Sequence, residues 1–287
     1  MKITAKSLIL DLLTAAGGPV PVRGPMRVAT LFGITENNVR VTLARLLARG
    51  VVERDERGRY RISAEASGVQ RHVASWEKLE DRMVAWDGGW IGVHTAGLPK
   101  SNRAASSRRL RAFDLLGLKE MQPDLWVRPD NLRGGIEAMR NRLDDLGLEP
   151  GALVCLLTEL DRRTEGRARR LWNVQALQGG YRKMRGSLQR SAERLPGIPL
   201  EKSIVESFVL GGECLRQVAL DPLLPEQILP AGERRRFIKE LQRYDRIGRE
   251  YWWRFMREHA EEIYSPPIQA HALDVIAPWR SKERGKA

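Results

Sequence analysis

Residues 31–50, "LFGITENNVRVTLARLLARG", constrain the fold of this chain more than any other segment. Three leucines, Leu43, Leu46 and Leu47, fall within about 80° of Val39 on a helical wheel of about 100° per residue. This spacing predicts a helix from Glu36 to Arg49 whose apolar stripe packs into a core. Thr35 carries the side-chain oxygen that an N-cap residue needs, and Gly50 is a common residue at a helix end.

The opposite face of this predicted helix carries short and polar side chains together with positive charge. It carries Asn37, Asn38, Val41, Ala44, Arg45 and Ala48, with Arg40 at its flank. Small residues allow a helix to lie deep in the major groove of DNA, where Asn can bind adenine and Arg can bind guanine or a phosphate. A helix face that is merely solvated more often alternates Glu and Lys. We therefore predict that this face contacts DNA.

The neighbouring segments complete a recognisable module in residues 1–65. Leucines and an isoleucine predict a first helix over residues 4–15, and "GGPVPVRGP" breaks it before a short helix that stops at Gly33. After Gly50, residues 51–54 and 59–62 alternate as two strands around "DERG". Helix-turn-helix followed by a basic hairpin predicts a winged helix-turn-helix, with Arg57 and Arg59 placed to reach the DNA backbone or minor groove. Such a module can also bind only protein, and it would then have no salt-dependent affinity for DNA.

The formal net charge of +13 is distributed unevenly along the chain. Residues 1–65 hold 11 basic and 6 acidic side chains, residues 66–160 hold 13 of each, and residues 161–287 hold 25 and 17. Excess Lys and Arg suit a polyanionic partner, because each phosphate contact releases condensed counterions. The charge favours double-stranded DNA as a partner, and a solvated basic surface without a partner is the alternative.

The middle of the chain predicts a small α/β domain. Residues 66–89 predict a linker that contains a helix, and residues 90–165 predict the order β-α-β-β-α-β, which is the ferredoxin-like arrangement. In this domain "ALVCLLTEL" is expected to be a buried strand, and Leu110, Phe113, Leu116 and Leu118 are expected to supply the apolar surface of the first helix. Many functions occur on such a domain, so the arrangement alone names none.

The rear of the chain, residues 166–278, predicts a helical domain, and residues 279–287 predict a disordered tail. Aromatic side chains are concentrated between residues 172 and 255 of it: Trp172, Tyr181, Phe208, Phe237, Tyr244, Tyr251, Trp252, Trp253 and Phe255. Aromatic residues on helices are most often core, and here they could also wall a ligand cavity with Arg at its mouth. The fold class predicted for the whole chain is α+β.

Several protein classes are disfavoured by the sequence. No apolar run approaches the roughly 20 residues that span a bilayer, and Asp11 interrupts the apolar part of the N-terminus, so we expect a cytoplasmic protein without a membrane partner. Cys155 and Cys214 lie in apolar surroundings, far apart, and are expected to be buried free thiols.

The chain has no sequence motif of a catalytic, cofactor or metal site. It lacks G-x-x-x-x-G-K-[ST], G-x-G-x-x-G after a strand, H-E-x-x-H and G-x-S-x-G. The four histidines, His72, His94, His259 and His271, are far apart, and the acid pairs Asp144–Asp145 and Glu261–Glu262 are expected to be solvated. We expect a protein that is not an enzyme and holds no metal or cofactor. A nucleic-acid-processing enzyme on the ferredoxin-like domain is the alternative, although its first strand ends without an acidic residue.

Three ordered motifs resemble one family, the PaaX-type regulators, which are repressors of phenylacetic acid degradation operons. In front, "LFGITENNVRVTLARLLARGVV" is similar to the family pattern around its recognition helix. In the middle, "WDGGWIGVHTAGLP" and "RRLRAFDLLGLKEMQPDLWVRPDNL" resemble its W-D-G-x-W and Trp-Pro segments, and in the rear "VALDPLLPEQILP" resembles its D-P-x-L-P element. The resemblance covers nearly the whole chain.

The resemblance implies properties that the residues alone do not. It implies a homodimeric bacterial repressor that binds a palindromic operator and is released by an aromatic acid or an aryl-CoA thioester such as phenylacetyl-CoA. The DNA contacts expected are Thr35, Asn37, Asn38, Arg40, Val41, Arg45, Arg57 and Arg59. Four residues are expected from their positions to bind the effector between the middle and rear domains: Trp90, His94, Arg128 and Trp172. The identities of effector and operator, and repression as opposed to activation, stay open.

Overall fold

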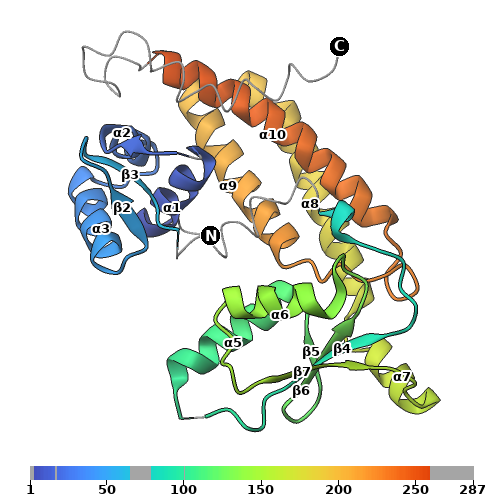
Figure 1. Cartoon of the computed structure of the whole chain (residues 1–287). Helices are drawn as coiled ribbons and strands as arrows, with labels where there is room; N and C mark the ends of the chain where they lie inside the picture. Colours follow the sequence, from blue (N-terminus) through green and yellow to red (C-terminus); the bar gives the residue numbers. More distant parts are fainter. Residues whose placement is uncertain (1–2, 17, 65–78, 100, 259–287) are drawn as a thin grey trace, which may run out of the picture. The chain divides into compact units, whose positions relative to one another are not determined.

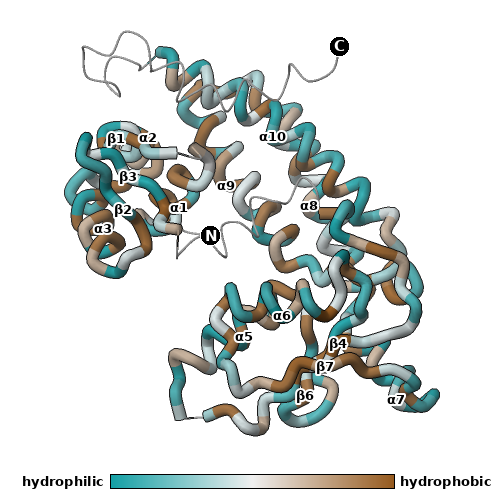
Figure 2. Tube along the Cα trace, in the orientation of Figure 1, coloured by the Kyte–Doolittle hydropathy of each residue, from teal (hydrophilic) through white to brown (hydrophobic). Residues whose placement is uncertain are grey.

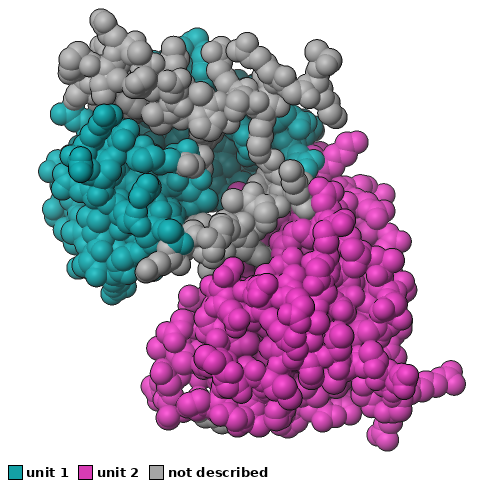
Figure 3. Space-filling model, viewed as in Figure 1, with its two compact units in different colours: residues 1–74, 187–213, 241–287 teal, residues 75–186, 214–240 magenta. Residues whose placement is uncertain are grey.

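The computed structural model describes residues 3–16, 18–64, 79–99 and 101–258 (Figure 1). These residues form helices and two antiparallel sheets, which confirms the predicted α+β class. The chain divides into two compact units (Figure 3). Unit 1 comprises residues 1–74, 187–213 and 241–287, and unit 2 comprises residues 75–186 and 214–240. Each unit combines segments that are distant in sequence, and the predicted domain boundaries stay a prediction.

The N-terminal part of unit 1 consists of three helices and a small sheet. The helices are α1 (Ala5–Ala16), α2 (Arg23–Leu31) and α3 (Glu36–Ala48), and the strands are β1 (Val20–Pro21), β2 (Val52–Arg54) and β3 (Arg59–Ile62) in the order β1-β3-β2. The second helix was expected to begin after the segment "GGPVPVRGP", residues 17–25, but α2 begins inside that segment, at Arg23. Pro25 lies in its first turn, where a missing N–H costs nothing. Strand β1 was not predicted, because it forms only by pairing with the distant Arg59 and Tyr60.

The core of unit 1 joins this N-terminal part to two helices from the rear of the chain. Helix α9 (Leu200–Ala219) contributes Ile204, and α10 (Gly232–Glu258) contributes Trp252 and Phe255. These side chains share one apolar cluster with the buried faces of α1, α2 and α3: Leu8, Ile9, Leu13, Val28, Ala29, Val39, Leu43 and Leu46. Burial of this apolar surface is the main favourable contribution to the stability of unit 1.

The rear of the chain is helical, as predicted, but divided differently. Two separate elements, α7 (Arg162–Arg169) and α8 (Val174–Arg194), form the start of the predicted helical domain. Asn173 separates them, because its side-chain carbonyl accepts a hydrogen bond of 2.9 Å from the Ala176 N–H and so caps the start of α8. A 3₁₀ turn, η3 (Leu195–Gly197), links α8 to α9. The unit boundaries fall within α8, α9 and α10, so each of these helices contributes residues to both units.

Unit 2 contains a four-stranded antiparallel sheet in the order β5-β6-β4-β7. Its strands are β4 (Trp90–His94), β5 (Lys119–Gln122), β6 (Leu125–Pro129) and β7 (Leu153–Leu157), and a short 3₁₀ turn, η2 (Glu80–Arg82), precedes them. Helix α5 (Arg103–Leu116) follows β4, and α6 (Gly135–Asp145) follows β6. Figure 1 shows these two helices next to each other on one side of the sheet.

Two burial predictions for this unit are wrong. Strand β7 is apolar throughout (Figure 2), yet it pairs only with β4 and so lies at the sheet edge. Leu153 and Leu156 are 61% and 47% exposed there, because a run of apolar residues does not ensure that both faces are covered. On α5, Leu110 is 47% exposed, whereas Phe113, Leu116 and Leu118 are buried as expected.

The "DPLLP" motif, residues 221–225, is a buried turn. The Asp221 carboxylate accepts hydrogen bonds from the Tyr181 hydroxyl at 2.7 Å and from the Leu223 N–H at 2.8 Å. Burial raises the pKa of Asp221, although the Arg234 guanidinium and the Tyr181 hydroxyl oppose the rise. The Leu223 carbonyl in turn accepts from the Asn131 side chain, so the motif ties the rear helices of unit 2 to the end of β6.

Gly117, which ends α5, is predicted to tolerate no side chain. Its φ is +70°, and a Cβ there would lie 2.6 Å from the Cα of Pro222. We expect Gly117→Ala to destabilise the protein by more than about 1 kcal/mol, measured by urea unfolding. Gly179→Ala on α8, where a Cβ meets nothing within 4 Å, is the control and should stabilise by up to about 1 kcal/mol. Equal midpoints for the two variants would contradict this account.

Candidate nucleic-acid interface

Helix α3 begins as predicted. The Thr35 hydroxyl accepts a hydrogen bond of 3.3 Å from the Asn38 N–H, which confirms Thr35 as the N-cap. The turn before it contains Gly33 at a φ of +68°, a conformation that favours glycine. Val39, Leu43 and Leu46 are buried in the core of unit 1, and Leu47 is half-buried. The core packing therefore determines which face of α3 lies outside.

The outer face of α3 is the one predicted from the sequence. Its side chains are all exposed: Asn37, Asn38, Arg40, Val41, Ala44, Arg45 and Ala48. The exposed fraction of Val41 is 40%, which is unusual for a β-branched apolar residue. An apolar side chain at the centre of a polar face suits contact with a thymine methyl group. We call this set the α3 face.

Charges on the α3 face are only partly neutralised within the protein. Arg40 lies 3.8 Å from Glu36, but both side chains are well exposed, so solvent screens the pair strongly. Arg45 has no acidic partner among the described residues. Asn38 accepts a hydrogen bond of 3.3 Å from the Thr42 hydroxyl. Thr42 is a residue that the sequence alone did not predict, although its i, i+4 spacing from Asn38 could have indicated it.

In the hairpin after α3, the two arginines that were predicted to contact DNA, Arg57 and Arg59, have different surroundings. Asp55 accepts hydrogen bonds from the Arg57 and Arg59 N–H groups and from the Arg59 guanidinium, at 3.0, 2.8 and 2.7 Å. Hydrogen bonds from the Arg59 N–H and side chain hold the pKa of Asp55 below its usual value. Arg59 is therefore paired inside the turn. The Arg57 side chain is exposed and has no acidic partner among the described residues, so its guanidinium is available to bind a phosphate.

Two of the four residues predicted to bind an effector lie together in unit 2. The Trp90 and Trp172 rings are stacked with centroids 6.2 Å apart, and Trp86 meets Trp90 edge-on at 5.3 Å. The Trp90 indole N–H donates a hydrogen bond of 2.7 Å to Glu165. The indole nitrogen of Trp172 is buried and has no hydrogen-bond partner among the described residues. This aromatic cluster is almost wholly buried.

The other two residues lie apart from this cluster. His94 is exposed at the far end of β4. Arg128 pairs in register with Ile91 on β4, so its side chain lies on the opposite face of the sheet from Trp90. It donates hydrogen bonds to the Leu116 and Pro129 carbonyls and to the Asn131 side chain, and burial lowers its pKa to about 9. The four residues do not converge on one surface, and their role in effector binding stays a prediction.

The remaining sequence expectations concern cysteines, metals and membranes. Neither cysteine forms a disulfide among the described residues; Cys214 is buried, and Cys155 is half-buried on the edge strand rather than fully buried. Within the described residues no group of three His, Cys, Asp or Glu could hold a metal ion. Across the same residues no helix combines the length and apolar character needed to cross a membrane. Residues 65–78 and 259–287 lie outside the described residues, and with them His72, His259, His271, the pair Glu261–Glu262 and the predicted tail.

Asp55 is predicted to hold the hairpin in shape. We expect Asp55→Ala to lower the urea midpoint of unfolding, because two backbone N–H groups and the Arg59 guanidinium lose their acceptor. The exposed Glu56→Ala should leave the midpoint nearly unchanged. Because the pKa of Asp55 is lower in the folded state than its ordinary value of 3.8, its carboxylate stabilises the folded protein fully at pH values above 3.8. This stabilisation is lost as the pH falls through the pKa of the folded state. Midpoints of wild type and Asp55→Ala that fail to converge at low pH would contradict this role.

Comparison with known proteins extends these observations. The sequence model of the PaaX-like protein family matches residues 4–66, which include α1 to β3. The transcriptional repressor PaaX of Escherichia coli (strain K12) is 25% identical over 240 residues, which cover 78% of this chain and 72% of the relative. Among solved structures, the uncharacterized protein Rv0674 from Mycobacterium tuberculosis has a similar fold, with a TM-score of 0.53, 21% identity and coverage of 87% of this chain and 99% of that one. These matches support the PaaX-type repressor family that the motifs of the chain predicted.

Proposed function

We propose that this protein is a transcriptional repressor that binds a palindromic DNA operator as a homodimer and releases it on binding an aromatic acid or aryl-CoA thioester. Residues 3–64 are a winged helix-turn-helix in this proposal, and residues 90–157 are a ferredoxin-like domain. The name of the Escherichia coli relative supports repression. The strand order β5-β6-β4-β7 supports the ferredoxin-like assignment. The proposal requires no catalytic residue and no resident cofactor.

One observation carries the proposal: the α3 face is exposed, and it combines two arginines with asparagines and small apolar residues. A rigid core holds α3 from behind, as a recognition helix requires, and the turn at Gly33 separates it from α2. The β2–β3 hairpin presents the exposed Arg57 at its turn, residues 55–58, which suits the wing that accompanies such a helix. The family match covers this same segment.

The geometry suggests different roles for the DNA contacts. Asn38 and Arg45 project from the exposed side of α3 and are proposed to contact base edges, with Asn37, Arg40 and Val41 beside them. Thr35 acts mainly through its N-cap hydrogen bond, which leaves the free N–H groups of the first turn of α3 for a phosphate. Arg57 is proposed to contact the backbone, and Arg59 to support the hairpin that presents it.

Selection of bound sequences from random duplex DNA tests the proposal. We expect an enriched palindrome, since a two-fold symmetric dimer binds two equivalent half-sites. The logarithm of the affinity should fall linearly with the logarithm of the salt concentration, by about 0.9 for each phosphate contact. Absence of an enriched sequence, or an affinity that does not respond to salt, would leave a module that binds only protein.

Three substitutions separate base contacts from phosphate contacts. Asn38→Ala and Arg45→Ala should each cost roughly 1–3 kcal/mol at one operator position and relax specificity there. Arg57→Ala should weaken all sequences about equally and reduce the salt slope by about 1. Arg111→Ala removes the same charge from an exposed position on α5 and should change neither. The proposed roles fail if the α3 variants weaken every operator position alike.

Release by a ligand is tested separately. Free aromatic acids and their CoA thioesters are titrated against the preformed complex with the selected operator, and anisotropy of labelled DNA reports release. A ligand can shift the equilibrium only if it binds the free protein more tightly than the DNA-bound protein. We expect at least one aryl compound to release the DNA, and the effector part of the proposal falls if none does.

A further inference from the structure

Helices α8 and α9 face each other in unit 1 with an unusual set of side chains. Helix α8 presents Ser187, Arg190, Ser191 and Arg194, and α9 presents Glu206, Val209, Leu210 and Glu213. Each set follows the spacing i, i+3, i+4, i+7, which marks the face that normally supplies apolar packing between two helices. Here most of the side chains are polar or charged, and a pocket of about 410 Å³ lies between the helices.

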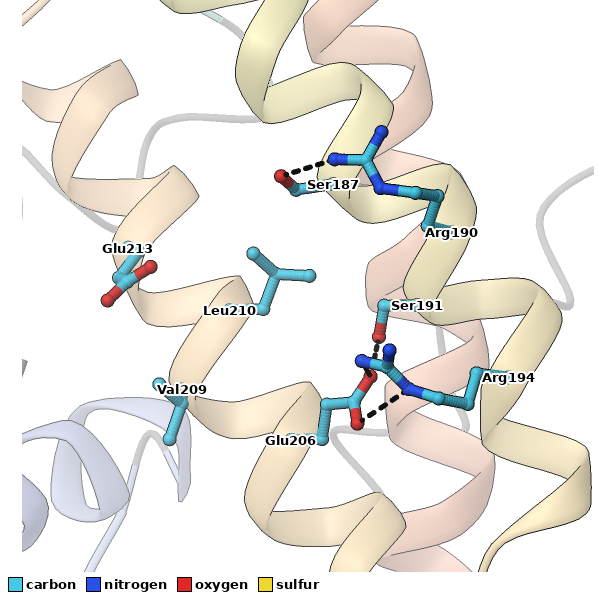
Figure 4. Close-up of a pocket in the computed structure, with 8 residues that line it drawn as sticks. All are labelled: Ser187, Arg190, Ser191, Arg194, Glu206, Val209, Leu210 and Glu213. Atoms are coloured by element: carbon cyan, nitrogen blue, oxygen red, sulfur yellow. Dashed lines mark hydrogen bonds and ion pairs between the residues drawn. The ribbon is translucent and has the colours of Figure 1, made fainter.

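One end of this pocket is closed by a polar network. The Arg194 guanidinium lies 2.7 Å from Glu206, which also accepts a hydrogen bond from Ser191 (Figure 4). The Ser191 hydroxyl lies 2.7 Å from the Tyr244 hydroxyl of α10. Burial tends to raise the pKa of Glu206, but hydrogen bonds from Arg194 and Ser191 hold it below its usual value. Arg194 and Glu206 therefore neutralise each other and form a fixed wall.

The other end of the pocket has a positive charge without an acidic partner. Within the described residues, the side chain of Arg190 is bonded only to the Ser187 hydroxyl, at 3.3 Å. Figure 4 shows Leu210 pointing from α9 toward α8, between this guanidinium and the Arg194–Glu206 pair. The Glu213 carboxylate, on the far wall, points away from Arg190 in the same view. A cationic group beside Val209 and Leu210 suits a ligand with one acidic group and a compact apolar body.

The opposite side of α9 is part of the core that supports α3. Ile204 and Phe208 lie on that side, and Ile204 is fully buried in the unit 1 cluster. The Phe208 ring meets Phe32, which follows α2, edge-on at 5.3 Å, and lies 5.8 Å from the Trp252 ring. On a wheel of about 100° per residue, Ile204 and Phe208 lie roughly opposite Glu206, Leu210 and Glu213. Any shift of α9 caused by filling the pocket would act directly on the core behind the DNA-binding helices, because packed interiors transmit strain.

We propose that the pocket between α8 and α9 binds a small organic acid through Arg190 and Ser187, and that α9 transmits its occupancy to the DNA-binding helices. The pocket has room for a free aromatic or branched aliphatic monocarboxylate, whereas a CoA thioester would have to leave its nucleotide outside. The transmission part rests on the proposed DNA-binding function, and the binding part does not.

Binding is tested on the full chain by isothermal titration calorimetry without DNA. The probes are benzoate, phenylacetate and 4-phenylbutyrate, with phenylacetamide as the neutral analogue and inorganic phosphate as a free anion. We expect at least one carboxylate to bind and phenylacetamide to bind much more weakly. Arg190→Gln should weaken carboxylate binding by roughly tenfold or more, since it removes a charge-assisted hydrogen bond. Arg182→Gln removes an equal charge from an exposed position on α8 and should have no effect.

Several outcomes would overturn the binding site. The proposal falls if no carboxylate binds at millimolar concentration, or if Arg190→Gln and Arg182→Gln bind it equally. Binding of inorganic phosphate as tight as that of the best carboxylate would show an anion site without an apolar body and would also overturn it. Leu210→Trp, which fills the pocket, should abolish binding while circular dichroism remains that of a folded protein. Retained binding by a folded Leu210→Trp variant would place the acid elsewhere.

Transmission is tested with the operator selected as described above. The acid that binds wild type should lower its DNA affinity, and Arg190→Gln should keep full DNA affinity without responding to the acid. Phe208→Leu, which makes a smaller contact with Phe32, should fold by circular dichroism, bind the acid normally and respond less. If the acid binds and DNA affinity is unchanged, transmission through α9 is wrong. If no DNA binds at all, the proposed function fails while the calorimetry still decides the pocket.

Discussion

The apolar core of unit 1 is the interaction on which the other features depend. It joins α1, α2 and α3 to Ile204 of α9 and to Trp252 and Phe255 of α10, segments from both ends of the described chain. Burial of Val39, Leu43 and Leu46 in this core turns the polar side of α3 outward. A recognition helix must be held rigidly from behind, because a loose helix would lose the geometry of its base contacts. The rear helices are therefore part of the support of the α3 face, for which DNA binding is proposed.

A second constraint is how the protein distributes its excess positive charge. Many arginines are committed to internal partners: Arg59 to Asp55, Arg194 to Glu206, Arg185 to Glu233 and Arg109 to Glu149. Arg45, Arg57 and Arg190 have no acidic partner among the described residues. Their positions, on the α3 face, at the hairpin turn and in the α8–α9 pocket, are those where an anion from outside the chain would complete the pairing. Net charge alone indicates a polyanionic partner, and the pairing shows which arginines are already neutralised within the protein.

Much of the N-terminal part of unit 1 was predictable because its determinants are local. The spacing of Val39, Leu43 and Leu46, the Thr35 cap and the "DERG" turn each act over a few residues, and each has the predicted conformation. Strand β1 was not predictable in this way, because Val20 and Pro21 pair with residues that come about forty positions later. Burial of β7 was also mistaken, since its place at the sheet edge depends on which strand pairs with β4. The α8–α9 pocket was hidden for the same reason: its two polar stripes become a site only when the helices face each other.

The sequence by itself determined the α+β class and the helix that carries Asn38 and Arg45, because these follow from periodicity and capping. Tertiary structure alone decided which charged side chains are already paired and which residues share a surface. Trp90 and Trp172 stack across eighty positions of sequence, whereas Arg128 lies on the opposite face of the sheet and bonds backbone carbonyls. The physical reason is that pairing and burial depend on distances between atoms, and folding sets those distances for residues that the sequence keeps far apart.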